Sequence, residues 1–206
     1  MKRRHFPLIL LVVLVLMLGT GRTVVAKGIF GGSDFINSPT NRVIPSGGYT
    51  LGAHIAEDRR GRIQLDYGLV TDFELGAAID LSRKDHEFSV RFKYQFIPET
   101  QKNFGLALGI QDIGKDRFSP YVVFGHVLAP HHLRWNFGLG GGELGGLFFG
   151  ISKVFYPDEF PQVTLVGEYD AYSLNLGAKI LLKKGILLNV AVIDMQDFLV
   201  GLTISN

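Results

Sequence analysis

The chain has 206 residues, of which 47% are hydrophobic, with 21 basic and 19 acidic residues and no cysteine. The absence of cysteine excludes disulfide staples and acylation of an N-terminal cysteine. The near-balanced charge gives no basic excess for binding nucleic acid, and no residue pattern indicates a cofactor.

Residues 1–26 have the organisation of a secretory signal peptide. A basic head (Lys2, Arg3 and Arg4) precedes an apolar stretch over residues 6–18, and small residues end at Ala26. A spanning helix needs about 20 apolar residues, which is more than this stretch provides. We therefore expect export with cleavage after Ala26, and an uncleaved membrane anchor is the alternative. Removing the segment takes away four basic residues and leaves a slight acidic excess.

Residues 27–48 come next and show no alternation of polar and apolar residues. They are rich in glycine, serine, asparagine and proline, which favour turns and irregular backbone. We expect this stretch to be an N-terminal periplasmic segment that leads into a single domain over residues 49–206.

From Tyr49 to the last residue the dominant signal is alternation of apolar and polar side chains. In residues 88–96 every even position is apolar and every odd position is polar. Successive side chains of a β-strand point to opposite faces, so such a segment has one apolar and one polar face. About twelve such segments follow one another, and most are close to the 9–11 residues that a tilted strand needs to cross a membrane. They start near Tyr49, Ile63, Phe73, Phe88, Phe104, Tyr121, Leu133, Leu147, Val163, Leu174, Ile186 and Phe198.

Short turn-forming stretches separate the segments, which predicts an up-and-down antiparallel arrangement. The longest connection lies around residues 113–119, so no loop is expected to fold into a barrel as a constriction. Residues 121–128 and 147–155 carry apolar residues on both faces. A bulge or a locally apolar interior would explain either segment.

The alternation fits a soluble sheet or a barrel in lipid, and three features favour lipid. The apolar face is aromatic or branched even in the first and last strands, the polar face carries full charges, and an export signal precedes it. In lipid every backbone polar group must be paired within the protein, which only a closed barrel achieves with strands. We expect an all-β transmembrane barrel in the outer membrane of a diderm bacterium, in contact with outer-membrane lipid and the barrel-assembly machinery. The candidate lumen-facing residues are Asp66, Glu74, Asp80, Arg91, Lys93, Arg134, Glu168 and Lys179.

The polar face leaves two interpretations open for its charges and two for its glycines. The charges could form a selectivity ladder across a small pore, or internal ion pairs that plug and rigidify the barrel. Glycines such as Gly68, Gly105, Gly138 and Gly201 could leave room for water, or relieve crowding and allow strands to bend.

Two short motifs resemble YjbH-type outer-membrane barrels, a family linked to exopolysaccharide production. The first is the stretch Ile36-Asn37-Ser38-Pro39-Thr40-Asn41, followed by a Pro-Ser-Gly turn before Tyr49. The second is Glu168-Tyr169-Asp170, followed by Asn175-Leu176-Gly177. Asn41 departs from the alanine usual in that family. The resemblance implies a barrel in the outer membrane with polysaccharide or envelope proteins as partners.

No catalytic or metal-binding constellation is evident in the sequence. His131 and His132 are adjacent, and neighbouring side chains on a strand or tight turn point apart. Ser152 and His126 lie on neighbouring predicted hairpins, but no nucleophile motif surrounds Ser152. We therefore expect a non-enzymatic protein without a metal. Two functions remain: a small channel or export accessory for polar solutes such as saccharides, and a plugged structural or interaction barrel of the cell envelope.

Overall fold

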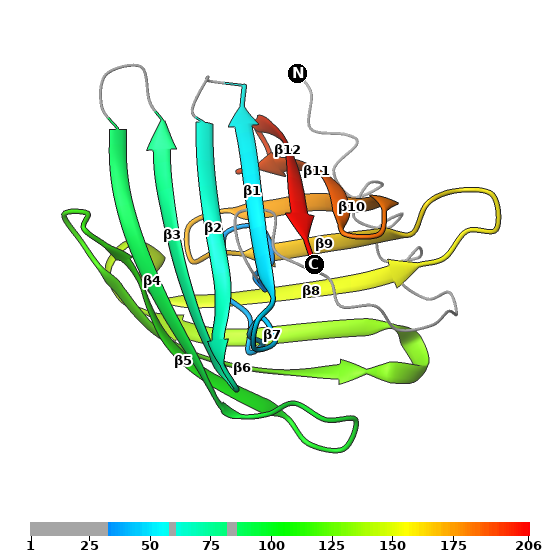
Figure 1. The fold of residues 1–206 in the computed structure, drawn as a ribbon, viewed down its shortest axis with the longest axis horizontal. Helices are drawn as coiled ribbons and strands as arrows, with labels where there is room; N and C mark the ends of the chain where they lie inside the picture. Colours follow the sequence, from blue (N-terminus) through cyan, green and yellow to red (C-terminus); the bar gives the residue numbers. More distant parts are fainter. Residues whose placement is uncertain (1–32, 58–60, 82–85) are drawn as a thin grey trace, which may run out of the picture.

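Twelve antiparallel strands form one closed barrel in the computed structural model, which describes residues 33–57, 61–81 and 86–206 (Figure 1). Each strand pairs with the next along the chain, and β12 closes the ring by pairing with β1. The strands are β1 (Tyr49–Ala56), β2 (Gly61–Val70), β3 (Phe73–Leu81), β4 (His86–Ile97), β5 (Gly105–Ile113), β6 (Ser119–Leu128), β7 (Leu133–Gly140), β8 (Leu147–Phe155), β9 (Val163–Tyr169), β10 (Leu174–Lys183), β11 (Ile186–Ile193) and β12 (Asp197–Ser205). The fold class expected from the alternation is confirmed.

The alternation in sequence becomes an alternation of burial along the strands. In β1 and β12, polar and small residues point into the barrel, while Leu51 and Leu202 are 43% and 49% exposed on the outside. Among the described residues, large exposed hydrophobic side chains occur on every strand except β11. The outer surface is therefore a continuous apolar band, and the polar groups are enclosed.

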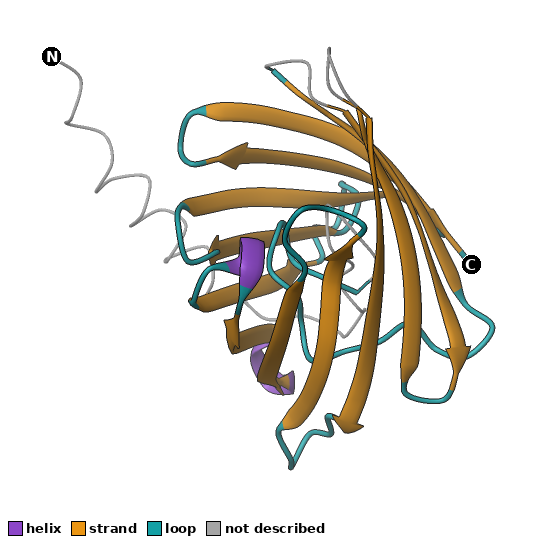
Figure 2. Ribbon diagram, turned by 90° about the vertical axis from the view of Figure 1, so that its left-hand side faces the viewer, coloured by secondary structure: helices purple, strands orange, loops and turns teal. Residues whose placement is uncertain are grey.

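The strands cross the barrel obliquely, and their ends define two mouths. In Figure 1 the front strands β1 to β4 run at a steep angle to β7, β8 and β9 behind them, as tilted strands on opposite walls do. We call the end where β1 begins and β12 ends the terminal mouth. The opposite end, where the β5–β6, β7–β8 and β9–β10 turns lie, we call the far mouth (Figure 2).

Strand β4 carries the largest irregularity of the wall. Its register against β5 shifts twice, between Val90 and Phe92 and between Gln95 and Ile97. Such bulges bend a strand and increase its twist, which helps a sheet to close on itself. A further shift between Gly68 and Val70 in the β2–β3 pairing lies at the terminal mouth.

The interior is locally apolar beside β6 and β8, the two segments with apolar residues on both faces. Tyr121, Val123 and Phe148 pack inside the wall with Leu144, which belongs to the short 3₁₀ helix η2 (Gly142–Leu144) at the far mouth. A second 3₁₀ helix, η1 (Ala129–His131), lies in the β6–β7 turn. Of the two explanations that the sequence left open, an apolar interior applies here.

Residues 33–44, which precede β1, lie inside the barrel (Figure 1, blue). Phe35 and Ile36 are 1% and 0% exposed, and they pack against Val166, Ala191 and Leu199 of the wall. The constriction therefore comes from the N-terminal segment, whereas the turns between strands stay short. The expected signal peptide, residues 1–26, lies outside the described residues.

No helix in the described parts of the chain is both long enough and apolar enough to cross a bilayer.

Candidate functional site in the barrel lumen

Residues 33–44 fold into a compact loop within the lumen, which we call the plug. The amide of Phe35 donates to the carbonyl of Ser38 at 3.1 Å, and the hydroxyl of Thr40 donates to the carbonyl of Ser33 at 2.7 Å. Its sequence contains one acidic residue, Asp34, and one basic residue, Arg42. The plug is thus a loop with hydrogen bonds of its own and no net charge.

Glu168 of β9 holds the part of the plug nearest the far mouth. Its carboxylate accepts three successive backbone N–H groups, from Ile36 at 3.0 Å, Asn37 at 2.7 Å and Ser38 at 3.1 Å. Asn175 of β10 donates to the same carboxylate at 3.0 Å. Hydrogen bonds to an ionised acceptor are about twice as strong as neutral ones, so this carboxylate is the main polar contact between plug and wall.

Asp170, in the β9–β10 turn beside Glu168, adds one further contact to the plug. It accepts from Nδ2 of Asn37 at 3.0 Å and from the backbone N–H of Ser173 at 2.9 Å. Burial alone would raise the pKa of Asp170, but the hydrogen bonds from Asn37, Ser173, Asn175 and Tyr172 together lower it below its usual value. The carboxylate is therefore stabilised in its charged, accepting form.

A cluster of charges on β3 and β4, with Glu74 near the start of β3, surrounds the first residues of the plug. The ammonium of Lys93 donates to the carboxylate of Asp34 and, at 2.7 Å, to the hydroxyl of Ser33. Glu74 lies 3.8 Å from that ammonium and accepts the backbone N–H of Ile44 at 2.8 Å. The first and last residues of the plug, Ser33 and Ile44, therefore lie beside the same Glu74–Lys93 pair.

The cation of Arg91 is neutralised mainly by the wall. Its Nε donates to Asp66 of β2 at 2.6 Å, whereas its Nη1 lies 3.9 Å from the carboxylate of Asp34. Asp66 is 0% exposed, so this pair is enclosed in the barrel. Arg91 would keep its principal partner without the plug.

Contacts to neutral groups of the plug fix the rest of it. Nζ of Lys179 on β10 donates to the backbone carbonyl of Asp34 at 3.1 Å, and Nε2 of Gln95 donates to the carbonyl of Asn41 at 2.7 Å. The side-chain amides of Asn41 and Asn136 are 2.6 Å apart. The wall thus offers both donors and acceptors to the plug.

Phe35 is the apolar anchor of the plug, and Gly150 of β8 makes room for it. A Cβ at position 150 would lie 2.1 Å from Cδ2 and 2.3 Å from Cε2 of the Phe35 ring. No side chain larger than glycine fits there while the ring keeps its place. At Gly68 a Cβ would lie 2.1 Å from the carbonyl oxygen of Pro45. This lumen-facing glycine therefore also leaves space for the N-terminal segment.

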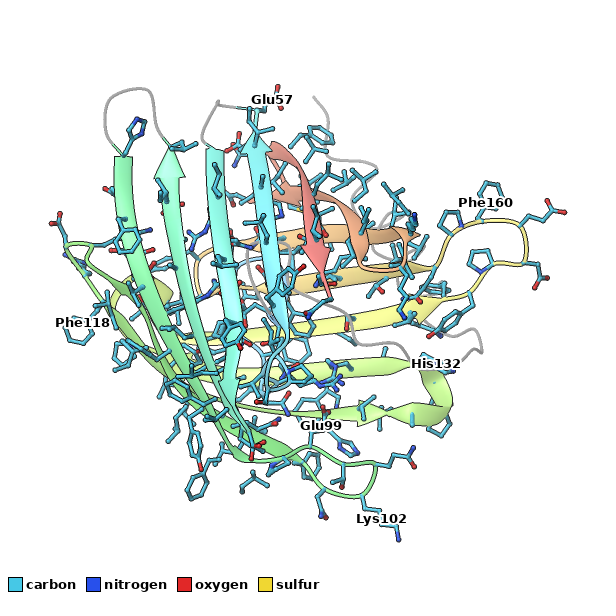
Figure 3. All side chains as sticks on the ribbon, viewed as in Figure 1. Glu57, Glu99, Lys102, Phe118, His132 and Phe160 are labelled. Atoms are coloured by element: carbon cyan, nitrogen blue, oxygen red, sulfur yellow. The ribbon has the colours of Figure 1, made fainter. Side chains whose placement is uncertain are left out.

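An ion pair lies beside Arg42 of the plug at the terminal mouth. Glu99, in the β4–β5 turn, accepts from Nη1 of Arg134 at 2.6 Å and lies 3.9 Å from Nε of Arg42. Its side chain is 4% exposed, and in Figure 3 it lies among the side chains of the barrel while Lys102 of the same turn points away. This turn therefore contributes to the closure of the lumen.

The far mouth opens into a cavity of about 580 Å³, which we call the far vestibule. Asp34, Ile36 and Asn37 of the plug form part of its lining. The other charged residues that line it are Arg62, Asp80, Glu87, Arg91, Asp112, Lys115, Glu143, Asp170 and Asp197. Carboxylates outnumber ammonium and guanidinium groups, although Asp80 is paired with Arg62 at 3.0 Å and with Lys115 at 2.6 Å.

The structure places all eight residues proposed as lumen-facing on the inner side of the wall. Glu74, Lys93, Glu168 and Lys179 contact the plug directly. The others serve elsewhere: Asp66 pairs with Arg91, Arg134 pairs with Glu99, and Asp80 lies at the rim of the far vestibule.

The two side chains considered for lipid hydrolysis do not form a pair. Ser152 of β8 is 2% exposed and faces the lumen, in register with Arg134. His126 of β6 is in register with Trp135 on the outer face, and its ring centroid lies 4.8 Å from that of Phe104. Among residues 33–57, 61–81 and 86–206, no group of three His, Asp or Glu side chains is placed to hold a metal ion.

Sequence reasoning missed the residues that the plug itself contributes. Phe35 and Ile36 were the available signal, because two large apolar residues stand together in an otherwise polar, glycine-rich stretch. Gly150 was a second signal, since it leaves a gap beside Phe148 on the inner face of β8. Neither observation specifies which part of the chain would fill the barrel.

Solved porins share this architecture. No family model matches the sequence, and no curated protein is significantly similar to it. The KdgM porin superposes with a TM-score of 0.57 at 12% identity over 76% of this chain and 98% of that one. A structure described as the KdgM porin in complex with disordered oligogalacturonate gives the same values, and the NanC porin gives a TM-score of 0.49 at 11% identity. At 12% identity the likeness to the KdgM porin shows the barrel fold alone.

Proposed function

We propose that this protein is an outer-membrane channel for polar solutes, and that in the conformation described here the plug closes it. The outward apolar band supports the membrane location, because soluble monomers rarely expose continuous apolar surface beyond a few hundred Å². A bilayer would cover that surface and leave the enclosed charges in contact with water and with each other.

One observation carries this proposal: charged side chains line much of the lumen, beside the apolar residues of β6 and β8, and the plug fills the space that they enclose. Glu74, Lys93, Glu168 and Lys179 all face the plug. If the plug moves, these groups line a continuous hydrated path between the two mouths. The YjbH-like motifs, and the fold shared with porins, support a saccharide as the solute.

A disulfide between plug and wall would test this proposal directly. A Cβ built on Gly150 lies 3.2 Å from Cγ of Phe35. The two Cβ atoms of a Phe35→Cys, Gly150→Cys variant are therefore about 3–5 Å apart, a separation that suits a disulfide. The chain has no cysteine of its own, so no other disulfide competes.

We expect the oxidised double variant to show no conductance in planar bilayers, and the reduced form to open, because reduction frees a plug that has lost its aromatic anchor. Phe35→Cys alone is the matched control and should be insensitive to oxidation. A flat trace from the reduced double variant, with folding verified, would contradict the channel proposal.

A permanently plugged structural barrel is the second candidate. The density of contacts around Glu168 and Glu74 favours it, since each is buried and bonded to several groups of the plug. This candidate predicts no conductance in either redox state. Envelope proteins that co-purify with the barrel would then identify its role.

A further inference from the structure

The contacts between plug and wall have a chemical pattern that indicates what else could bind there. The plug donates six hydrogen bonds to three wall carboxylates, from backbone amides, one hydroxyl and one side-chain amide. The acceptors that it offers to Lys93, Lys179 and Gln95 are three carbonyls, one hydroxyl and a single carboxylate. Almost every group that the plug contributes to these contacts is thus a neutral donor or acceptor.

We propose that the wall groups around the plug form a binding site for a neutral, polyhydroxylated solute such as an oligosaccharide, and that the plug occupies this site until the solute displaces it. This inference rests on the proposed channel function and names its solute class. Sugar hydroxyls both donate and accept, so they can replace amide donors at Glu168 and carbonyl acceptors at Lys179.

The charges of the site argue against an acidic solute. When Asp34 leaves, Arg91 keeps its bond to Asp66 at 2.6 Å, and Lys93 stays 3.8 Å from Glu74. Arg91 and Lys93 therefore retain carboxylate partners on the wall, while Glu168 would face an incoming carboxylate. Repulsion between like charges brought together in this way disfavours binding of an acidic solute.

The far vestibule provides the route to the site. Its volume of about 580 Å³ lies within the range of small-molecule pockets, about 300–1,000 Å³. Asp34, Ile36 and Asn37 form part of its lining, so a solute in the vestibule already touches the plug where Glu168 holds it. The excess of carboxylates around the cavity also disfavours anions there.

Ser38 provides a specific probe of plug displacement. It is 0% exposed, and its hydroxyl has no hydrogen-bond partner within the described part of the chain. A Ser38→Cys substitution therefore removes no side-chain hydrogen bond and introduces the chain's one thiol. The labelling rate with a small polar methanethiosulfonate reagent then reports the fraction of molecules with a displaced plug.

The experiment compares maltose, glucuronate and sodium chloride on the refolded Ser38→Cys barrel in lipid vesicles. A ligand that binds only the open state raises the open population about tenfold at ten times its Kd. We expect maltose to raise the labelling rate in this way, and we expect glucuronate and salt at matched ionic strength to leave it unchanged. Adding Glu168→Gln should weaken the maltose dependence, whereas Asp158→Asn on an exposed turn should not.

Two results would overturn the inference. If maltose and glucuronate raised the labelling rate equally, the site would not be selective for neutral solutes. If no solute changed the labelling rate, solute binding would not displace the plug. Conductance of the reduced Phe35→Cys, Gly150→Cys variant is independent of both results, because it requires no solute. An open reduced variant together with maltose-insensitive labelling would therefore refute the binding site and leave the channel in place.

Discussion

Among single residues, Glu168 holds the plug most strongly, because its carboxylate accepts three backbone N–H groups of the plug. A Glu168→Gln substitution keeps the shape, leaves one acceptor oxygen in place of two, and turns an amide NH₂ toward the plug's own N–H donors. Hydrogen bonds to charged groups contribute about 1.5–3 kcal/mol each, so we expect a loss of roughly 3 kcal/mol of plug attachment. In the Ser38→Cys background this loss corresponds to about a hundredfold faster thiol labelling.

The matched control for Glu168→Gln is Asp158→Asn, which removes a carboxylate from an exposed turn between β8 and β9. Its labelling rate should equal that of the parent. If Glu168→Gln also labelled at the parent rate, the three N–H contacts would not be what holds the plug.

Packing of the Phe35 ring against Gly150 can also be tested, because the large ring fits only beside a residue without a Cβ. An added Cβ at position 150 would lie 2.1 Å from the Phe35 ring. Overpacking of this kind costs about 1–3 kcal/mol, so Gly150→Ala should loosen the plug and speed labelling of Ser38→Cys. Replacing Phe35 by leucine in the same chain should restore part of the slow rate. The absence of any rescue would mean that the two positions are not in contact.

At the scale of elements, the sequence predicts the strands well and the contents of the barrel poorly. The alternation in residues 88–96 predicts β4, because burial on one face repeats every second residue whatever lies beyond the strand. The position of the plug depends on contacts between Ile36 and Glu168, which are 132 residues apart. No local periodicity encodes such a contact, and only the paired apolar residues Phe35 and Ile36 hint at burial.

Closure of the barrel by β1 and β12 gives the third prediction. Gly201 of β12 is in register with His54 of β1, and a Cβ there would lie 2.6 Å from the carbonyl oxygen of Ala53. Because that oxygen belongs to the backbone ladder, it cannot move without breaking strand pairing. We expect Gly201→Val to prevent closure, seen as loss of the compact fast-migrating band in unheated SDS gels. Val200→Leu, on the outer face, should keep that band, and a normally migrating Gly201→Val protein would contradict this role of the glycine.

At the scale of the whole molecule, the acidic rim of the far vestibule sets the charge preference of the open channel. Glu87 and Glu143 line this cavity and are exposed. A mouth lined mainly by carboxylates concentrates cations. We therefore expect the reduced Phe35→Cys, Gly150→Cys variant to prefer potassium over chloride in reversal-potential measurements across a salt gradient.

Neutralising both rim residues with Glu87→Gln and Glu143→Gln should lower that preference, more clearly at low salt because screening is weaker there. A chloride-selective reduced variant, or a preference unchanged by the two substitutions, would mean that the charges deeper in the lumen control selectivity.

In the proposed outer-membrane channel, the apolar face of the barrel lies in hydrocarbon while the polar face encloses the plug. Trp135 of β7 is the single tryptophan of the chain and belongs to the outer face, with Phe124 at a centroid distance of 5.9 Å. The most direct measurement is quenching of its fluorescence in vesicles of brominated lipid. We predict strong quenching for Trp135 and weak quenching after the tryptophan is moved to the lumen by Trp135→Phe, Phe148→Trp. Strong quenching only of the lumenal tryptophan, or none of Trp135, would contradict the account.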